Sequence, residues 1–138
     1  IEKLEGKITF DEAVEEATRL LKAAVQRLSQ RDGRLGLYLT SGLDSRVILG
    51  LMDPGRKPVT ITFGKKDSRD AVYAAEMARR AGLENHVFEF ESGKWVQEHA
   101  DLHLELTEGF HSWIHMHGIS ILPNVHELLD INLSGIKN

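Results

Sequence analysis

Short apolar segments alternate along this chain with longer segments of helical periodicity, and no other feature constrains the fold as strongly. The apolar segments span 35–39, 59–63, 86–90 and 129–133. We read them as strands buried on both faces, because apolar residues fill them without strict alternation. Such strands separated by helices indicate an α/β fold, a doubly wound parallel sheet, in which ligands bind beyond the carboxyl ends of the strands.

Helix signals lie between the predicted strands. Thr9 and Glu12 have the spacing of a capping box, and Ser68 and Gly82 are suited to begin and end a helix. The predicted helices span 10–28, 47–51, 68–82 and 95–106, and 107–128 is expected to be helical without defined bounds.

Composition excludes several classes of protein. The 138 residues suit one domain, residues 1–138, and contain no cysteine, which excludes disulfides, thiolate zinc sites and a cysteine nucleophile. A net charge of -4 argues against a nucleic-acid-binding surface. No apolar run approaches the roughly 20 residues of a membrane span, so we expect a cytoplasmic protein without a membrane partner. Because the chain opens at Ile1 and ends soon after the fourth strand, we expect an excerpt, truncated at its C-terminal end.

The loop at 40–45, Thr-Ser-Gly-Leu-Asp-Ser, joins the first predicted strand to a helix. Small hydroxylated residues and a glycine allow the backbone to approach an anion, and the following helix directs its positive dipole end at it. Asp44 suits this setting as a ligand of Mg²⁺, which prefers carboxylates together with phosphate oxygens. The alternative is that Ser41 or Asp44 only caps the helix.

This loop resembles the Ser-Gly-Gly-Leu-Asp-Ser loop of the N-type ATP pyrophosphatases, and most closely that of glutamine-dependent asparagine synthetases. It is neither a Walker loop nor a dinucleotide fingerprint. The resemblance covers 35–135 and implies a Rossmann-like fold of the adenine nucleotide alpha-hydrolase type. Three further segments follow in the family's order: Thr62-Phe63-Gly64 after the second strand, then Asp70, then Leu133-Ser134-Gly135 after the fourth strand.

The resemblance also implies roles for individual residues. The implied metal ligands for Mg²⁺ are Asp44 and Asp70. The implied phosphate contacts are Thr40, Ser41, Gly42, Leu43 and Ser45, and the positions around the adenosine are Tyr38, Leu39, Phe63, Gly64, Ser134 and Gly135.

The chemistry implied by the resemblance is attack of a substrate carboxylate, aspartate in the family, on the α-phosphate of ATP. Pyrophosphate leaves, and ammonia converts the acyl-adenylate to an amide. The implied partners are ATP, a small carboxylate and an upstream glutaminase domain or subunit, and a homodimer is one expected assembly. Two other hypotheses stay open: a nucleotide-binding module without synthetase activity, and an ATP pyrophosphatase acting on another substrate such as a nucleic-acid base. The absence of cysteines and of a basic face weighs against the thiolating, tRNA-modifying kind of the second.

This sequence departs from the family's pattern in three places. Thr40-Ser41 stands where the family has Ser-Gly, Arg46 follows the loop, and 136–138 replaces an acidic segment. We therefore expect no amide synthesis by this excerpt alone.

Arg46 either adds a cation near the phosphates or points into solvent. Lys65, Lys66 and Arg69 are interpreted as a solvated loop, with the alternative that one of them reaches the triphosphate.

Seven histidines occur, and three of them, His111, His115 and His117, cluster in sequence. The pairs 99/103 and 111/115 have helical spacing, but the glutamate of a zinc-protease motif is missing. We interpret these residues as packed or surface histidines rather than metal ligands. A further hypothesis places His111, Ser112 and His115 beside a second-substrate pocket.

Overall fold

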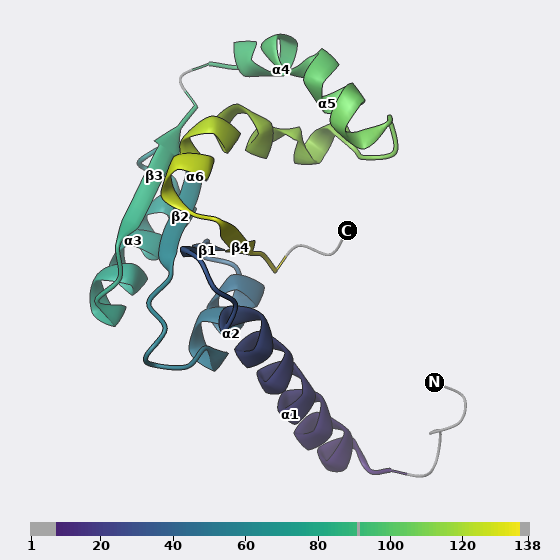
Figure 1. The fold of residues 1–138 in the computed structure, drawn as a ribbon, viewed down its shortest axis with the longest axis vertical. Coiled ribbons are helices and arrows are strands. Elements are labelled where there is room, and N and C mark those ends of the chain that lie inside the picture. Colours follow the sequence, from purple (N-terminus) through teal and green to yellow (C-terminus); the bar gives the residue numbers. More distant parts are fainter. Residues whose placement is uncertain (1–7, 91, 136–138) are drawn as a thin grey trace.

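Four parallel strands form one sheet in the order β3-β2-β1-β4 (Figure 1). The structure is a computed structural model that describes residues 8–90 and 92–135, without the side chains of 113–115. Its elements are α1 (Phe10–Ser29), β1 (Leu35–Tyr38), α2 (Leu43–Leu51), β2 (Val59–Gly64), α3 (Arg69–Ala81), β3 (Asn85–Glu89), α4 (Lys94–Glu98), α5 (Ala100–Thr107), the 3-10 helix η1 (Trp113–Ile121), α6 (Leu122–Leu128) and β4 (Ile131–Leu133).

The sheet reverses its winding direction between β1 and β4. Gly36 of β1 lies opposite both Val59 of β2 and Asn132 of β4. The chain moves outward from β1 through β2 to β3 and then crosses back to the far side of β1. Loops that follow neighbouring strands of opposite winding diverge and leave a crevice at the carboxyl edge of the sheet. The predicted doubly wound parallel sheet is therefore confirmed.

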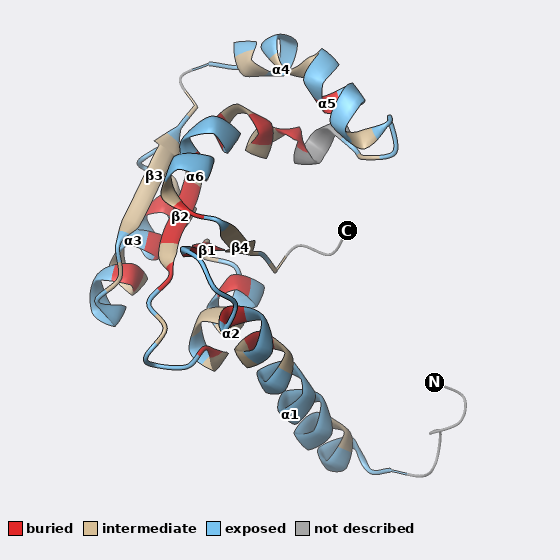
Figure 2. Ribbon diagram, viewed as in Figure 1, coloured by how far each residue is buried: buried red, intermediate tan, exposed pale blue. Residues whose placement is uncertain are grey.

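Helices cover both faces of this sheet. On one face, Leu37 of β1 packs in a cluster with Val25 of α1 and Ala74 of α3. On the other face, Ile61 of β2 packs against Val125 of α6. Figure 2 shows buried residues on β2 and on turns of the surrounding helices, whereas the edge strands β3 and β4 carry no buried residue. A parallel sheet requires this double covering, because its strands are apolar on both sides.

The predicted helix ends are confirmed at three positions. The Thr9 hydroxyl accepts a bond from the Glu12 N–H, and the Glu12 carboxylate accepts one from the Thr9 N–H, which completes the capping box. Ser68 caps α3 by accepting a bond from the Ala71 N–H at 3.2 Å. Gly82 ends the same helix with a φ of 65°, a conformation that glycine adopts at little cost.

Several predicted bounds were wrong. Helix α2 begins at Leu43 rather than 47, since apolar periodicity does not register a polar first turn. The predicted helix 95–106 is two short helices, broken at His99, and the segment 107–128 contains η1 and α6. Strand β3 begins and ends one residue before its prediction, and β4 begins two residues later.

Helix α1 forms as predicted, but most of its apolar stripe lies on the surface. Val25 and Ser29 near its C-terminal end are buried, whereas Phe10 at the other end is 81% exposed. The helix extends away from the sheet beyond its contact with α2 (Figure 2). Helical periodicity therefore predicted the conformation of this segment correctly but not its burial.

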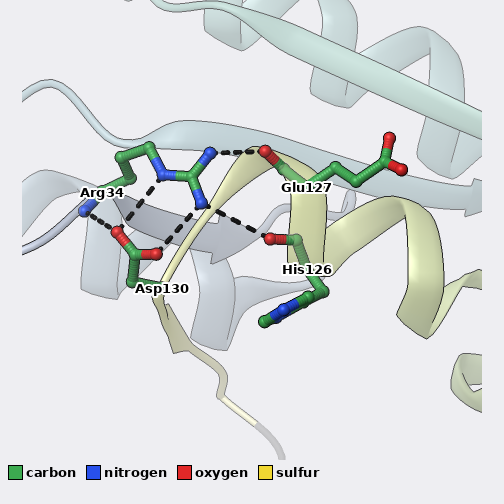
Figure 3. Close-up of polar contacts among 4 residues, drawn as sticks. All are labelled: Arg34, His126, Glu127 and Asp130. Carbon is green, nitrogen blue, oxygen red and sulfur yellow. Dashed lines mark hydrogen bonds and ion pairs between the residues drawn. The ribbon is translucent and has the colours of Figure 1, made fainter.

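A cluster of polar contacts around Arg34 joins the start of β1 to the start of β4 (Figure 3). The Arg34 backbone N–H donates to Asp130 at 2.8 Å, and its guanidinium donates to the same carboxylate at 3.0 Å. The guanidinium also donates to the carbonyls of His126 and Glu127 at the end of α6. A cation at this end of a helix is stabilising, because the helix dipole is negative there.

Acid is expected to weaken this cluster. The side-chain hydrogen bonds from Arg34, and then its backbone N–H bond, lower the pKa of Asp130 from 3.8 to about 2. A lowered folded-state pKa means that the carboxylate contributes its full stability above about pH 4 and loses it as the pH falls towards 2. Unfolding midpoints of the wild type and Asp130→Asn, measured from pH 5 to pH 2, should therefore converge as the pH falls. A gap that stays constant over this range would contradict the prediction.

Candidate functional site

The loop 40–45 is held in shape by its own hydroxyl groups. Ser45 is buried, and its Oγ accepts a bond from the Thr40 N–H at 3.1 Å. The Thr40 hydroxyl lies 3.2 Å from the same oxygen and accepts a bond from the Gly42 N–H at 3.0 Å. These bonds curl the backbone tightly at the carboxyl end of β1, so that α2 starts directly after it.

The N-terminus of α2 carries no side-chain cap. Its N-cap residue is Gly42, and no side chain in the described part of the chain accepts a bond from the first turn. The amide groups of this turn are therefore left for another acceptor. The alternative that Ser41 or Asp44 merely caps the helix is wrong, because Asp44 lies within the first turn and Ser41 bonds elsewhere.

Ser41 is bonded to Asp70, which lies 29 residues away in the first turn of α3. The Ser41 N–H and hydroxyl both donate to Asp70 Oδ1, at 2.8 Å and 2.5 Å. Asp70 thus ties the loop to α3 and fixes the position of the loop. Its predicted role as a metal ligand stays a prediction.

A cavity of about 290 Å³ lies at the switch between β1 and β4. Its described lining comes from the carboxyl ends of three strands and from the loop after β1. The lining residues are Tyr38, Thr40, Gly42, Asp44, Ser45, Phe63, Ser134 and Gly135. Each of these residues belongs to the set predicted from the sequence, and the fold brings them together from positions spread over almost 100 residues.

Gly135 brings the loop after β4 into contact with the start of α2. A Cβ placed on Gly135 would lie 2.6 Å from the Asp44 Cβ and 3.3 Å from the Ser45 backbone nitrogen. Real Cβ atoms do not approach other carbon atoms this closely, so only glycine fits here. The absence of a side chain at this position is what allows the two walls of the cavity to meet.

Five predicted residues lie outside this lining. Leu39 is fully buried in the core, and its carbonyl accepts a bond from Thr62 at 2.8 Å. Leu43 is 66% exposed. The other three are Gly64, Ser41 and Asp70.

Aromatic rings form one wall of the cavity. Tyr38 and Phe63 meet edge to face with their centroids 5.4 Å apart, and His117 lies 5.0 Å from Phe63 on another side. Burial raises the pKa of the Tyr38 phenol above its usual value, so this group is neutral at physiological pH. His117 was not predicted at this site, because the histidine cluster carried no signal that linked it to the loop. The result is an apolar wall of rings at steep angles to one another, facing a polar loop.

The carboxylate of Asp44 in the lining is suited to a hard cation such as Mg²⁺. Asp44 is exposed and forms no hydrogen bond or ion pair with another described residue. Within 8–90 and 92–135 there is no group of three or more histidine, aspartate or glutamate residues that could hold a metal by itself. A Mg²⁺ ion here would take Asp44 as one ligand and its remaining oxygens from a bound phosphate and water.

A second cavity of about 500 Å³ lies beyond β3 and includes Trp95, His99 and Asn124 in its described lining. Phe90, which also lines it, lies 6.0 Å from Phe63, so these two rings separate the cavities. The hypothesis of a second-substrate pocket named His111, Ser112 and His115 instead.

The structure describes only some of the side chains that this hypothesis names. His111 lies beside buried His103, which approaches the His111 carbonyl to 3.2 Å. The His115 side chain lies outside the described residues.

This chain is similar to a known protein family and to solved structures. The family model described as asparagine synthase matches residues 16–120. A search of curated proteins gives no match. Among solved structures, the chain is similar to an NH3-dependent NAD synthetase from Campylobacter jejuni in complex with nitrate, with a TM-score of 0.46 and 16% identity. That match covers 83% of this chain and 49% of the other, so the chain spans about half the length of that structure. In the described part of the chain, no helix has the length and apolarity to cross a membrane.

Proposed function

Because this chain belongs to the asparagine synthase family, a family of ATP-using and amide-forming synthetases, we propose that its first cavity binds ATP and activates a carboxylate, aspartate foremost, as an acyl-adenylate. The observation that carries the proposal is the composition of the cavity at the β1/β4 switch. An aromatic wall, a helix N-terminus without a described side-chain cap and the Asp44 carboxylate, which pairs with no described residue, face one another there. These are the groups that a base, a phosphate chain and its magnesium ion require.

The orientation of ATP follows from the chemistry of the two walls. The adenine ring suits the side formed by Tyr38 and Phe63, and the phosphates suit the amides at the start of α2. Asp44 would hold Mg²⁺, which when bound neutralises charge on the phosphates. Ser134 and Gly135 close the cavity from the β4 side. In this proposed orientation the α-phosphate would lie between the aromatic wall and the loop.

The proposed reaction has two steps. A carboxylate oxygen of the acid attacks the α-phosphorus, and the bond to the bridging oxygen breaks, so that pyrophosphate leaves with the electron pair. Ammonia then attacks the acyl carbon, AMP leaves, and the nitrogen loses its surplus proton to water. The chain contributes by holding the triphosphate in line and by directing the α2 amides at its charge. Ammonia would come from a glutaminase domain or subunit. The use of ATP as a reactant supports the expected cytoplasmic setting.

A pyrophosphate-release assay tests the proposal on the full-length protein. With ATP, Mg²⁺ and ammonia present, pyrophosphate and AMP should form in equal amounts only when aspartate or another acid from an amino-acid panel is added. Omission of the acid is the control, because it separates activation of a carboxylate from simple ATP hydrolysis. Binding of ATP without pyrophosphate release for any acid would refute the synthetase assignment and favour a nucleotide-binding module.

A further inference from the structure

A third cavity, of about 280 Å³, is lined by residues of α2 and α3 and by Ser41 of the loop 40–45. Its described lining carries three guanidinium groups and one carboxylate. The lining residues are Ser41, Arg46, Arg69, Tyr73, Glu76, Met77 and Arg80, and we call this cavity the arginine groove. Ser41 lines the groove, whereas the adjacent Gly42 lines the first cavity.

Two of the three arginines in the groove are not neutralised. The Arg46 Nε donates to the Gly42 carbonyl at 3.1 Å, which ties this side chain to the loop. Arg69 lies over the Tyr73 ring at 5.7 Å. Neither has a carboxylate partner among the described residues. Arg80, by contrast, is bonded to Glu76 at 2.7 Å.

The surrounding carboxylates are already engaged. Glu76 is shared between Arg79 and Arg80, and these bonds lower its pKa to about 2. Asp70 accepts both bonds from Ser41. The groove therefore presents positive charge beside Ser41 of the loop, and its planar guanidinium groups match the geometry of phosphate oxygens.

The groove and the first cavity meet at the loop. Consecutive Cα atoms lie about 3.8 Å apart, so the boundary between Ser41 and Gly42 is short compared with a triphosphate. The uncapped start of α2 lies at the same boundary. An anion held by these amides therefore has Asp44 on one side and Arg46 on the other.

We propose that the arginine groove binds the β- and γ-phosphates of ATP, the part that leaves as pyrophosphate, through Arg46 and Arg69. This inference rests on the proposed function. The nucleoside and α-phosphate stay in the first cavity, and the chain of phosphates crosses the loop. Arg46 and Arg69 are then binding residues that distinguish ATP from AMP, because AMP has no phosphates to place in the groove.

Calorimetry on the full-length protein with MgATP and with AMP tests this assignment. Arg46→Gln and Arg69→Gln should each weaken ATP binding about tenfold, because a charge-assisted hydrogen bond to phosphate is lost. AMP affinity should change by less than about twofold. Both side chains are exposed, so folding should be unaffected, and thermal unfolding of each variant checks this. Lys22→Gln is the matched control, because it removes one positive charge from exposed α1.

The outcomes separate this inference from the proposed function. A double variant that binds ATP as tightly as the wild type would overturn the groove assignment and leave the first cavity as the ATP site. Equal losses of ATP and AMP affinity would also overturn it, since the arginines would then act through the loop. A wild-type protein that binds neither nucleotide would overturn both proposals.

Discussion

Replacing Asp44 by asparagine is expected to lower the affinity for ATP in the presence of Mg²⁺ by at least about a hundredfold. Loss of a residue that merely supports a metal ligand costs about 10- to 100-fold in metal affinity, and a direct ligand should cost no less. The free energy of unfolding should fall by less than about 1 kcal/mol, because the carboxylate is exposed and contributes only through the helix dipole. Calorimetry with and without Mg²⁺ measures the first effect, and denaturant unfolding measures the second.

Asp101→Asn is the matched control for this prediction. Asp101 occupies the same position in the first turn of α5 that Asp44 occupies in α2, but it does not line the first cavity. A similar small loss of stability is expected from this variant, with no effect on ATP binding. Unchanged magnesium dependence in Asp44→Asn would argue that the ion, if it binds, takes its protein ligand elsewhere.

Replacing Gly135 by valine is expected to damage both the site and the fold. Even a Cβ here would lie 2.6 Å from the Asp44 Cβ, and valine adds two further methyl groups. Overpacking of this kind costs about 1–3 kcal/mol in the free energy of unfolding. The loop after β4 must move away from α2, which opens the first cavity and should weaken ATP binding about a hundredfold, close to 3 kcal/mol.

Gly50→Ala on α2 is the control for Gly135→Val. A Cβ on Gly50 would have no atom within 4 Å, and alanine favours a helix interior by roughly 1 kcal/mol over glycine. This variant should therefore be at least as stable as the wild type and should bind ATP normally. If Gly135→Val kept wild-type affinity and stability, the two loops would not be in the contact described.

The sequence by itself determined the fold class and the main wall of the candidate site. Buried strands alternating with helices led to a parallel sheet, and the carboxyl ends of parallel strands necessarily share one edge. The family resemblance supplied the individual site residues, Tyr38, Asp44, Phe63 and Gly135 among them. The shared edge explains why they meet, since each lies at or just beyond the end of a strand. Local patterns sufficed to recognise the strands and helices, because side-chain periodicity is a property of short segments.

Only the tertiary structure decided how the loop 40–45 is held and that the arginine groove lies beside it. The bond from Ser41 to Asp70 spans 29 residues, and the meeting of Gly135 with Asp44 spans most of the chain. The arginine groove likewise exists only because residues of α2 and α3 line the same hollow. Helical periodicity also marked α1 as having an apolar face without revealing that Phe10 is exposed. Such contacts depend on which elements become neighbours, and a pattern within one segment carries no information about its partners.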